Sequence, residues 1–254
     1  DERYLSGAIG ENARSTTQDP YTSVAKMTNV LPVCKLAKAD GSLLYAQYTY
    51  RENMVPKTLY VPAVYTDLTG DNGAFTALQS ATYYESPEGT STYDAHNGAQ
   101  IQMLVNSYGQ TQAVELPSSF NGVITLTTAG IDDSILPYQG PGTTATIRRS
   151  SFSDAPMYTV NGKFTLSNVI LDGAKVSYTV NADGGIVRVP SGGQLTIQRD
   201  AVLQNSRVAD GRNGGALYIA SGGNVTMTGG TIRQNLVSST GYGAGVYLSV
   251  GSKL

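Results

Sequence analysis

A repeat of about 30 residues occupies the C-terminal part of this 254-residue chain and limits the folds open to it. Residues 184–197 and residues 214–227 align without a gap, and the pattern restarts at residues 243–248, one residue early. A fixed period of this length is typical of architectures in which each unit stacks on its neighbours. The period therefore constrains the fold more than any single motif does.

Each repeat contains three short apolar runs separated by corners rich in Gly or Asn. In the fullest unit these runs cover residues 186–189, 195–197 and 202–203. The run that matches each one lies a full period away, so stacking the periods pairs like with like and makes three parallel sheets. We therefore predict an all-β fold, a right-handed parallel β-helix with three short strands per rung of about 30 residues.

Two other folds are also compatible with a repeat of this length or with many short strands. A pair of helices per repeat is disfavoured, because the apolar runs are two to four residues long and are surrounded by Gly and Thr. A β-sandwich is the stronger alternative, since it also consists of many short strands.

Stacked rungs place equivalent residues above one another. The predicted apolar ladders are Val187, Leu217 and Val246, and Val189, Ile219 and Leu248. Asn205 and Asn235 also stand one period apart. Because Asn tolerates left-handed corners, we expect these two side chains to stack as an amide ladder inside the coil.

The rest of the chain divides into two further regions. Residues 99–150 are predicted to form earlier, less regular rungs, so the β-helix covers residues 99–254. Residues 28–98 contain a predicted hairpin around Asp40 and Gly41 and an amphipathic helix over residues 73–85 that would cap the open end of the core. Residues 1–27 are polar and lack periodicity, and we expect an extended lead-in there.

The rungs resemble a known group of proteins. Residues 145–149, 157–160 and 162–173, followed by the Gly-Gly rungs at residues 214–219 and 229–232, are similar to pectate-lyase-like β-helices in large adhesin-like surface proteins of Gram-positive gut bacteria. The resemblance covers residues 99–254. It implies a secreted, wall-attached protein that binds host molecules, and it carries no defined catalytic motif. The chain stops inside a rung, so we expect further rungs to follow in a larger protein, truncated here at the C-terminus.

Composition narrows the class of partner. The net charge is −2 and no basic run exceeds two residues, which disfavours a nucleic-acid partner. No apolar stretch approaches the ~20 residues of a membrane span, so we expect no membrane insertion. The single cysteine, Cys34, cannot form an internal disulfide. We expect an extracellular monomer at the bacterial cell surface, attached to the wall through regions outside this chain.

Candidate catalytic carboxylates are few. Stacking brings Asp172 near Gln204, and the next equivalent position is predicted to be Gln234, so no carboxylate recurs along this row. Asp183 and Asp200 fall at corners, where Asp is an ordinary turn residue. A polysaccharide lyase or glycoside hydrolase on the β-helix is therefore the alternative, and we predict no catalytic residue.

Metal ligands are also sparse. His96 is the only histidine, which rules out a His-based site. The oxygen ligands Asp67, Asp71 and Asn72 lack the full Ca²⁺-loop pattern, and the pair Asp132–Asp133 reads as a solvated turn. We predict no metal and no cofactor.

Tyrosines are the most suggestive surface feature. They crowd the N-terminal region, where Tyr48, Tyr50 and Tyr60 are the candidate binding residues. Tyrosine binds proteins and glycans through a rigid ring and a hydroxyl, although it also fills β-sheet surfaces. We predict a non-enzymatic adhesin-type or host-factor-binding domain for a host glycoprotein, matrix protein or immunoglobulin. A purely structural stalk is the remaining alternative.

Overall fold

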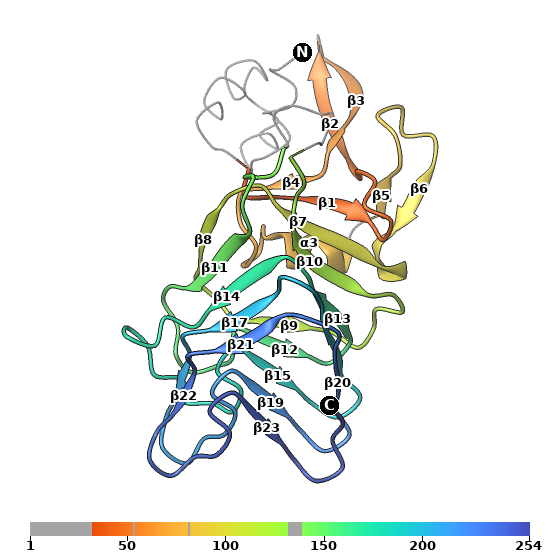
Figure 1. The fold of residues 1–254 in the computed structure, drawn as a ribbon. Helices are drawn as coiled ribbons and strands as arrows, with labels where there is room; N and C mark the ends of the chain where they lie inside the picture. The colour runs from red at the N-terminus through yellow and green to blue at the C-terminus, as the bar shows by residue number, and fades with distance from the viewer. Residues whose placement is uncertain (1–31, 53, 81, 132–138) are drawn as a thin grey trace.

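The computed structural model describes residues 32–52, 54–80, 82–131 and 139–254, and β-strands dominate it (Figure 1). The all-β prediction is confirmed at this level, and the sheets are largely parallel. The predicted lead-in over residues 1–27 and the pair Asp132–Asp133 lie outside the described residues. No helix in the described part of the chain is long and apolar enough to cross a membrane.

Three sheets form the main body. Sheet 1 contains, in spatial order, β20 (Asn224–Met227), β16 (Gln194–Ile197), β13 (Lys163–Leu166), β10 (Ile124–Thr128), β7 (Ala99–Met103), β1 (Cys34–Lys38) and β4 (Val64–Tyr65). Sheet 2 contains β21 (Thr231–Arg233), β17 (Val202–Gln204), β14 (Val169–Asp172), β11 (Ala145–Arg149) and β8 (Ser107–Gln110). Sheet 3 contains β23 (Val246–Leu248), β19 (Leu217–Ile219), β15 (Val187–Val189), β12 (Tyr158–Val160) and β9 (Val114–Leu116).

From β7 onward the chain visits the three sheets in rotation (Figure 1). Strands β7, β8 and β9 lie in sheets 1, 2 and 3, and each later set of strands repeats that order. Strands that follow one another in sequence do not pair here; β7 pairs in parallel with β10, and β10 with β13. Between sheets 2 and 3 in chain order, the later passages add β18 (Arg207–Val208) and β22 (Leu236–Val237), which pair with each other. We call one passage through the three sheets a rung.

The register between rungs changes from 30 residues to 29 within one corner. In β15–β19, Val187 lies opposite Leu217, an offset of 30, whereas in β17–β21 Val202 lies opposite Thr231, an offset of 29. The difference arises where residues 228–230 take the place of residues 198–201 before the next strand begins.

This change of register means that the predicted ladder of Asn205 and Asn235 is wrong. Continuing the pairing of β17 with β21 places Asn205 level with Gln234, and Asn235 level with Ser206. Asn205 does take the left-handed conformation expected of a corner, with φ 54°. Asn235 instead accepts a hydrogen bond from the Ser206 N–H at 3.0 Å and donates to the Leu203 carbonyl at 3.0 Å.

Apolar side chains from the three sheets fill the space that the sheets enclose. The paired apolar residues of sheet 3 are Val187, Leu217 and Val246, and Val189, Ile219 and Leu248. The members in β15 and β19 are fully buried, whereas Leu248, in the outermost strand of the sheet, is 45% exposed. Burying a Val, Leu or Ile side chain stabilises a fold by ~1.5–3 kcal/mol, so these contacts hold successive rungs together.

The N-terminal region joins this body through antiparallel pairing. Strand β1 pairs antiparallel with both β7 and β4, so sheet 1 changes direction at this end. After β1 the chain turns at Asp40 and Gly41, where the Lys38 N–H donates to the Ser42 carbonyl at 2.8 Å. A separate sheet contains, in order, β3 (Val55–Pro62), β2 (Tyr45–Glu52), β5 (Thr82–Tyr84) and β6 (Thr92–Asp94). The 3-10 helix η2 (Ala95–Asn97) then leads into β7.

Helix α3 (Ala74–Ser80) packs against the core where the rungs begin. The Phe75 ring lies 5.8 Å from the Tyr158 ring of β12 and 6.2 Å from the Phe164 ring of β13, measured between centroids. The helix predicted over residues 73–85 was too long, because residues 82–84 form β5, which pairs with β6. The short helix still covers apolar side chains of the rungs, as predicted for a helix that caps the core.

Candidate functional site

The three predicted binding tyrosines lie on two opposite faces of the β2–β3 hairpin. Tyr48 and Tyr50 are two residues apart on β2, and their rings stack at 6.3 Å with an interplanar angle of 10°. Tyr60 pairs with Gln47, which alternates with Tyr48 along β2 and therefore points to the other face. The structure does not bring the three tyrosines into one surface.

Tyr60 is engaged in packing within its own sheet. Its ring meets the Tyr84 ring edge-on, with centroids 4.5 Å apart. It also lies against Gly89, where a Cβ atom would approach the ring to 2.1 Å. The Tyr84 hydroxyl in turn donates to Gln47 Oε1 at 2.6 Å. These contacts give Tyr60 a stabilising role.

Buried phenols and the single thiol lie in and around the junction between the N-terminal region and the first rungs. The Tyr65 and Tyr83 hydroxyls are 3.0 Å apart, and the Tyr108 hydroxyl donates to Asp67 Oδ1. Burial raises the pKa of Tyr65 and of Tyr108 to about 12, and it raises the pKa of the Cys34 thiol well above its usual range. A thiol held protonated in this way is a poor nucleophile, so this group is suited to packing rather than catalysis.

Asp172 belongs to a row of polar side chains on the outer face of sheet 2, which we call the closed row: Asp172, Gln204 and Arg233. Asp172 Oδ2 accepts hydrogen bonds from Gln204 Nε2 at 3.1 Å and from Asn205 Nδ2 at 2.8 Å. Gln204 Oε1 accepts from Arg233 Nε at 3.0 Å and from Arg233 Nη2 at 2.8 Å. The sequence predicted Gln234 as the third residue of this row. Because the register here is 29 residues, Arg233 lies opposite Gln204 instead. The row is linked from end to end by its own hydrogen bonds.

The other candidate acids, and the single histidine, belong to turns or bond to neighbouring groups. Asp183 Oδ1 accepts a hydrogen bond from the Asn213 N–H at 2.7 Å, and Asp200 takes a left-handed turn conformation with φ 61°. His96 Nδ1 lies 2.7 Å from Asp94 Oδ1, and its ring stacks on Phe120 with centroids 4.6 Å apart. In the part of the chain that the structure describes, no group of three or more His, Cys, Asp or Glu side chains could hold a metal ion.

An aromatic row follows the outer face of sheet 3. The Arg188 guanidinium carbon lies 5.8 Å from the centroid of the Tyr218 ring, and the Tyr218 and Tyr247 rings stack at 5.3 Å with an interplanar angle of 6°. The Tyr218 hydroxyl accepts a hydrogen bond from Ser249 Oγ at 3.1 Å. Because these groups stack on one another, Tyr218 has little free ring face for a ligand, and the row links successive rungs.

Three stacked turns connect sheet 3 to sheet 1 in the later rungs. Their third positions are held by Gly192, Gly222 and Gly251, with φ of 82°, 78° and 82°. The N–H after each glycine donates back across the turn, as Gly193 does to the Pro190 carbonyl at 3.1 Å. These are the features of type II turns, which require a positive φ at the third position and therefore favour Gly.

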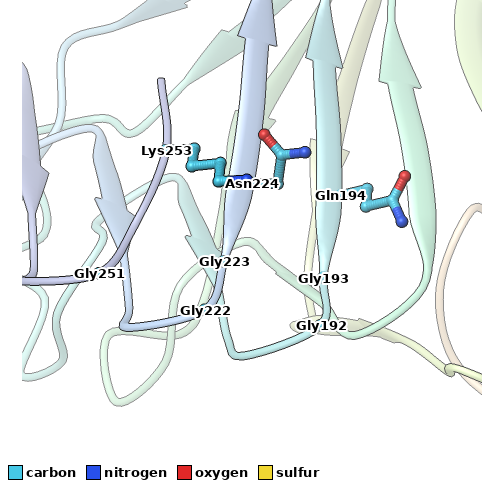
Figure 2. A pocket seen from close by; sticks show the side chains of 8 residues that line it. All are labelled: Gly192, Gly193, Gln194, Gly222, Gly223, Asn224, Gly251 and Lys253. Atoms are coloured by element: carbon cyan, nitrogen blue, oxygen red, sulfur yellow. The ribbon is translucent and has the colours of Figure 1, made fainter.

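A second polar row begins directly after these turns, at the start of the strands of sheet 1. Gln194 pairs with Asn224, and Asn224 forms a parallel bridge with Lys253. Together with the glycines of the turns, these three residues line a hollow of ≈ 320 Å³, which we call the glycine trough (Figure 2). All three are exposed. Their side chains make no hydrogen bond or ion pair with any described residue, and we call them the open row.

The open row offers hydrogen-bonding capacity that the fold leaves unused. Each amide can donate and accept, and the Lys253 ammonium adds a positive charge and three donors. Among the described residues no carboxylate lines the trough, and its floor is backbone, because five of the eight lining residues are glycines. Beside this row, Thr165, Thr196 and Thr226 follow one another across sheet 1. The arrangement can bind a polar ligand, but it contains no acid–base pair for chemistry.

Sequence reasoning did not identify the open row. The available signal was the gapless alignment of Gln194 with Asn224 immediately after two consecutive glycines in each repeat. Lys253 follows Asn224 at an offset of 29, the same offset at which the pattern restarts at residues 243–248, so the sequence carried a signal for this position too.

Comparison with known proteins identifies no relative. No protein-family model, no curated protein and no solved structure matches this chain.

Proposed function

We propose that this chain is a right-handed parallel β-helix that serves as a non-enzymatic, adhesin-type binding domain at the surface of a Gram-positive gut bacterium. The rotation of strands through three parallel sheets supports the helix. The general preference of parallel crossovers for the right hand, at ≈ 98% of cases, supports its handedness. The resemblance of residues 99–254 to surface-protein rungs supports the location.

The observation that carries the binding function is the open row. Gln194 lies on β16, which pairs with β13 and β20, and Asn224 pairs with Gln194 on one side and forms a bridge with Lys253 on the other. The backbone under both amides is therefore held from two sides, so a ligand would meet a preorganised surface and little ordering entropy would be lost. In the closed row, by contrast, equivalent polar groups are already bonded to one another. Host glycoproteins, matrix proteins and immunoglobulins are the proposed partners, and all of them present polar surfaces that such a row could bind.

A binding screen tests this function. Immobilised chain is exposed to mucin glycoproteins, matrix proteins and immunoglobulins, with a chain unfolded in urea as the control for nonspecific capture. Saturable binding to one class by the folded chain alone is the expected result. Failure to bind any class would favour the structural stalk.

The enzymatic alternative has its own readout. Pectins, mucin glycans and glycosaminoglycans are incubated with the chain, and new unsaturated or reducing ends are measured over time. We expect none above the level of a heat-denatured control. Turnover that depends on protein concentration would replace the binding proposal with a polysaccharide lyase or hydrolase.

A further inference from the structure

The open row continues one rung further back through Lys163, which pairs with Gln194 across β13 and β16. Lys163 is exposed, and its ammonium uses one donor on the Asn121 carbonyl at 2.9 Å. The full order across sheet 1 is therefore Lys163, Gln194, Asn224 and Lys253, in which two amides lie between two cations. Neighbouring strands are ~4.8 Å apart, so the row extends for roughly 14 Å. Its regular spacing suits a chain-like ligand that lies along the row.

The chemistry of the row favours a glycan over a peptide. Amides donate and accept hydrogen bonds, as sugar hydroxyls do, and Thr196 and Thr226 of the adjacent row add further hydroxyls, whereas Thr165 is buried. The described lining of the trough consists of glycine backbone and polar side chains with no apolar one, so it offers no pocket for the side-chain anchors that dominate peptide recognition. The two lysines favour negative charge on the ligand, and none of the eight described residues that line the trough is a carboxylate that would oppose it.

We propose that the glycine trough and the row from Lys163 to Lys253 form a binding site for a linear acidic glycan that lies along the row. The ligand contacts Gln194 and Asn224 through its hydroxyls, and its carboxylate or sulfate groups pair with the lysines at the two ends. This inference rests on the proposed binding function and adds to it the place of the site and the chemistry of the ligand.

The test measures affinity for size-defined chondroitin sulfate, with dextran as the neutral glycan and poly-glutamate as the acidic peptide. The wild-type chain should bind chondroitin sulfate best and should bind it less tightly as salt rises, because ion pairs with exposed lysines are screened. Replacing both lysines (K163Q and K253Q together) should lower the affinity about tenfold and flatten the salt dependence. Lys57, exposed on the β2–β3 hairpin, supplies the matched control K57Q.

A second pair of variants separates the amides from the charges. Removing both amides (Q194A and N224A together) should lower affinity about tenfold, since each net hydrogen bond contributes about 0.5–1.5 kcal/mol. Gln198 is exposed beyond the far end of β16, so Q198A is the matched control and should bind like the wild type.

Three results would overturn the inference. The first is equal affinity of the lysine variant and the wild type for chondroitin sulfate, and the second is equal or tighter binding of poly-glutamate. The third is capture of a host protein that neither the lysine variant nor the amide variant weakens, which leaves the binding function standing and removes this site from it. Absence of binding to every glycan and every host protein would overturn both proposals together.

Discussion

The closed row and the open row are built in the same way but leave their polar groups in different states. Both consist of outward-facing side chains on consecutive strands of a parallel sheet, one per rung. In the closed row, Asp172, Gln204 and Arg233 satisfy one another through hydrogen bonds. In the open row, Gln194, Asn224 and Lys253 make none with described residues. The difference teaches that regular stacking alone does not reveal a binding surface, and that hydrogen-bond accounting separates structural rows from available ones.

The largest expected effect concerns the floor of the glycine trough. In Gly193→Ala the new Cβ atom would lie 1.9 Å from the Val160 carbonyl oxygen of the neighbouring rung, so the backbone must shift. We expect a loss of about 3 kcal/mol in the free energy of unfolding, measured by urea denaturation. Gly192→Ala is the matched control, because a Cβ there meets nothing within 4 Å and the cost is that of the positive φ alone, about 1 kcal/mol. Equal losses for the two variants would contradict this account of the trough.

The tyrosines of the hairpin extend the comparison to the N-terminal region. Tyr60 is packed between Tyr84 and Gly89, so Tyr60→Ala should lower the free energy of unfolding by about 2 kcal/mol. Tyr60→Phe keeps the ring and should lower it by less than about 0.5 kcal/mol. If Tyr60→Phe were as damaging as Tyr60→Ala, the hydroxyl rather than the ring would carry the role.

The closed row should show a smaller effect. Gln204→Ala removes the amide that links Asp172 to Arg233, and we expect a loss of about 1 kcal/mol in the free energy of unfolding, because both partners retain access to water. The charge-preserving comparison is Arg233→Lys, which keeps the cation but loses the paired donors on Gln204. A Gln204→Ala variant as stable as the wild type would show that the bonded row contributes nothing.

The open row should show the smallest effect on stability. Asn224→Ala removes an exposed side chain without a described partner, so the free energy of unfolding should change by less than about 0.5 kcal/mol. Thermal and urea denaturation of the same preparation give the measurement. A loss above about 1 kcal/mol would mean that Asn224 has a structural role and does not belong to an open row.

The sequence predicted the general fold better than the site, and the reason is physical. Apolar periodicity specifies which strands stack, so the all-β class with parallel sheets followed from the repeat. The sequence showed that the offset has become 29 by residue 243, but not the corner at which it changes. Residues 228–230 replace a corner that is one residue longer, so Asn235 coincides with Asn205 in the alignment without lying level with it. The same one-residue change of register places Arg233, rather than Gln234, in the closed row with Asp172 and Gln204.

The tyrosines failed as a predicted site for a related reason. Whether two residues on different strands lie on the same face of a sheet depends on how the strands pair. The sequence did not indicate that Tyr60 of β3 pairs with Gln47 of β2. Nor could it show that Gly89, far along the chain, lies under the Tyr60 ring. Packing partners and hydrogen-bond partners, rather than residue type, separated Tyr60 and the closed row from the open row.

The most direct test measures two properties of two variants side by side. Affinity for chondroitin sulfate and the free energy of unfolding are determined for the amide variant (Q194A with N224A) and for Q204A. We expect the amide variant to lose about tenfold in affinity at unchanged stability, and Q204A to lose about 1 kcal/mol in stability at unchanged affinity. The reverse pattern, or a loss of both properties in both variants, would contradict the distinction between an available row and a structural one.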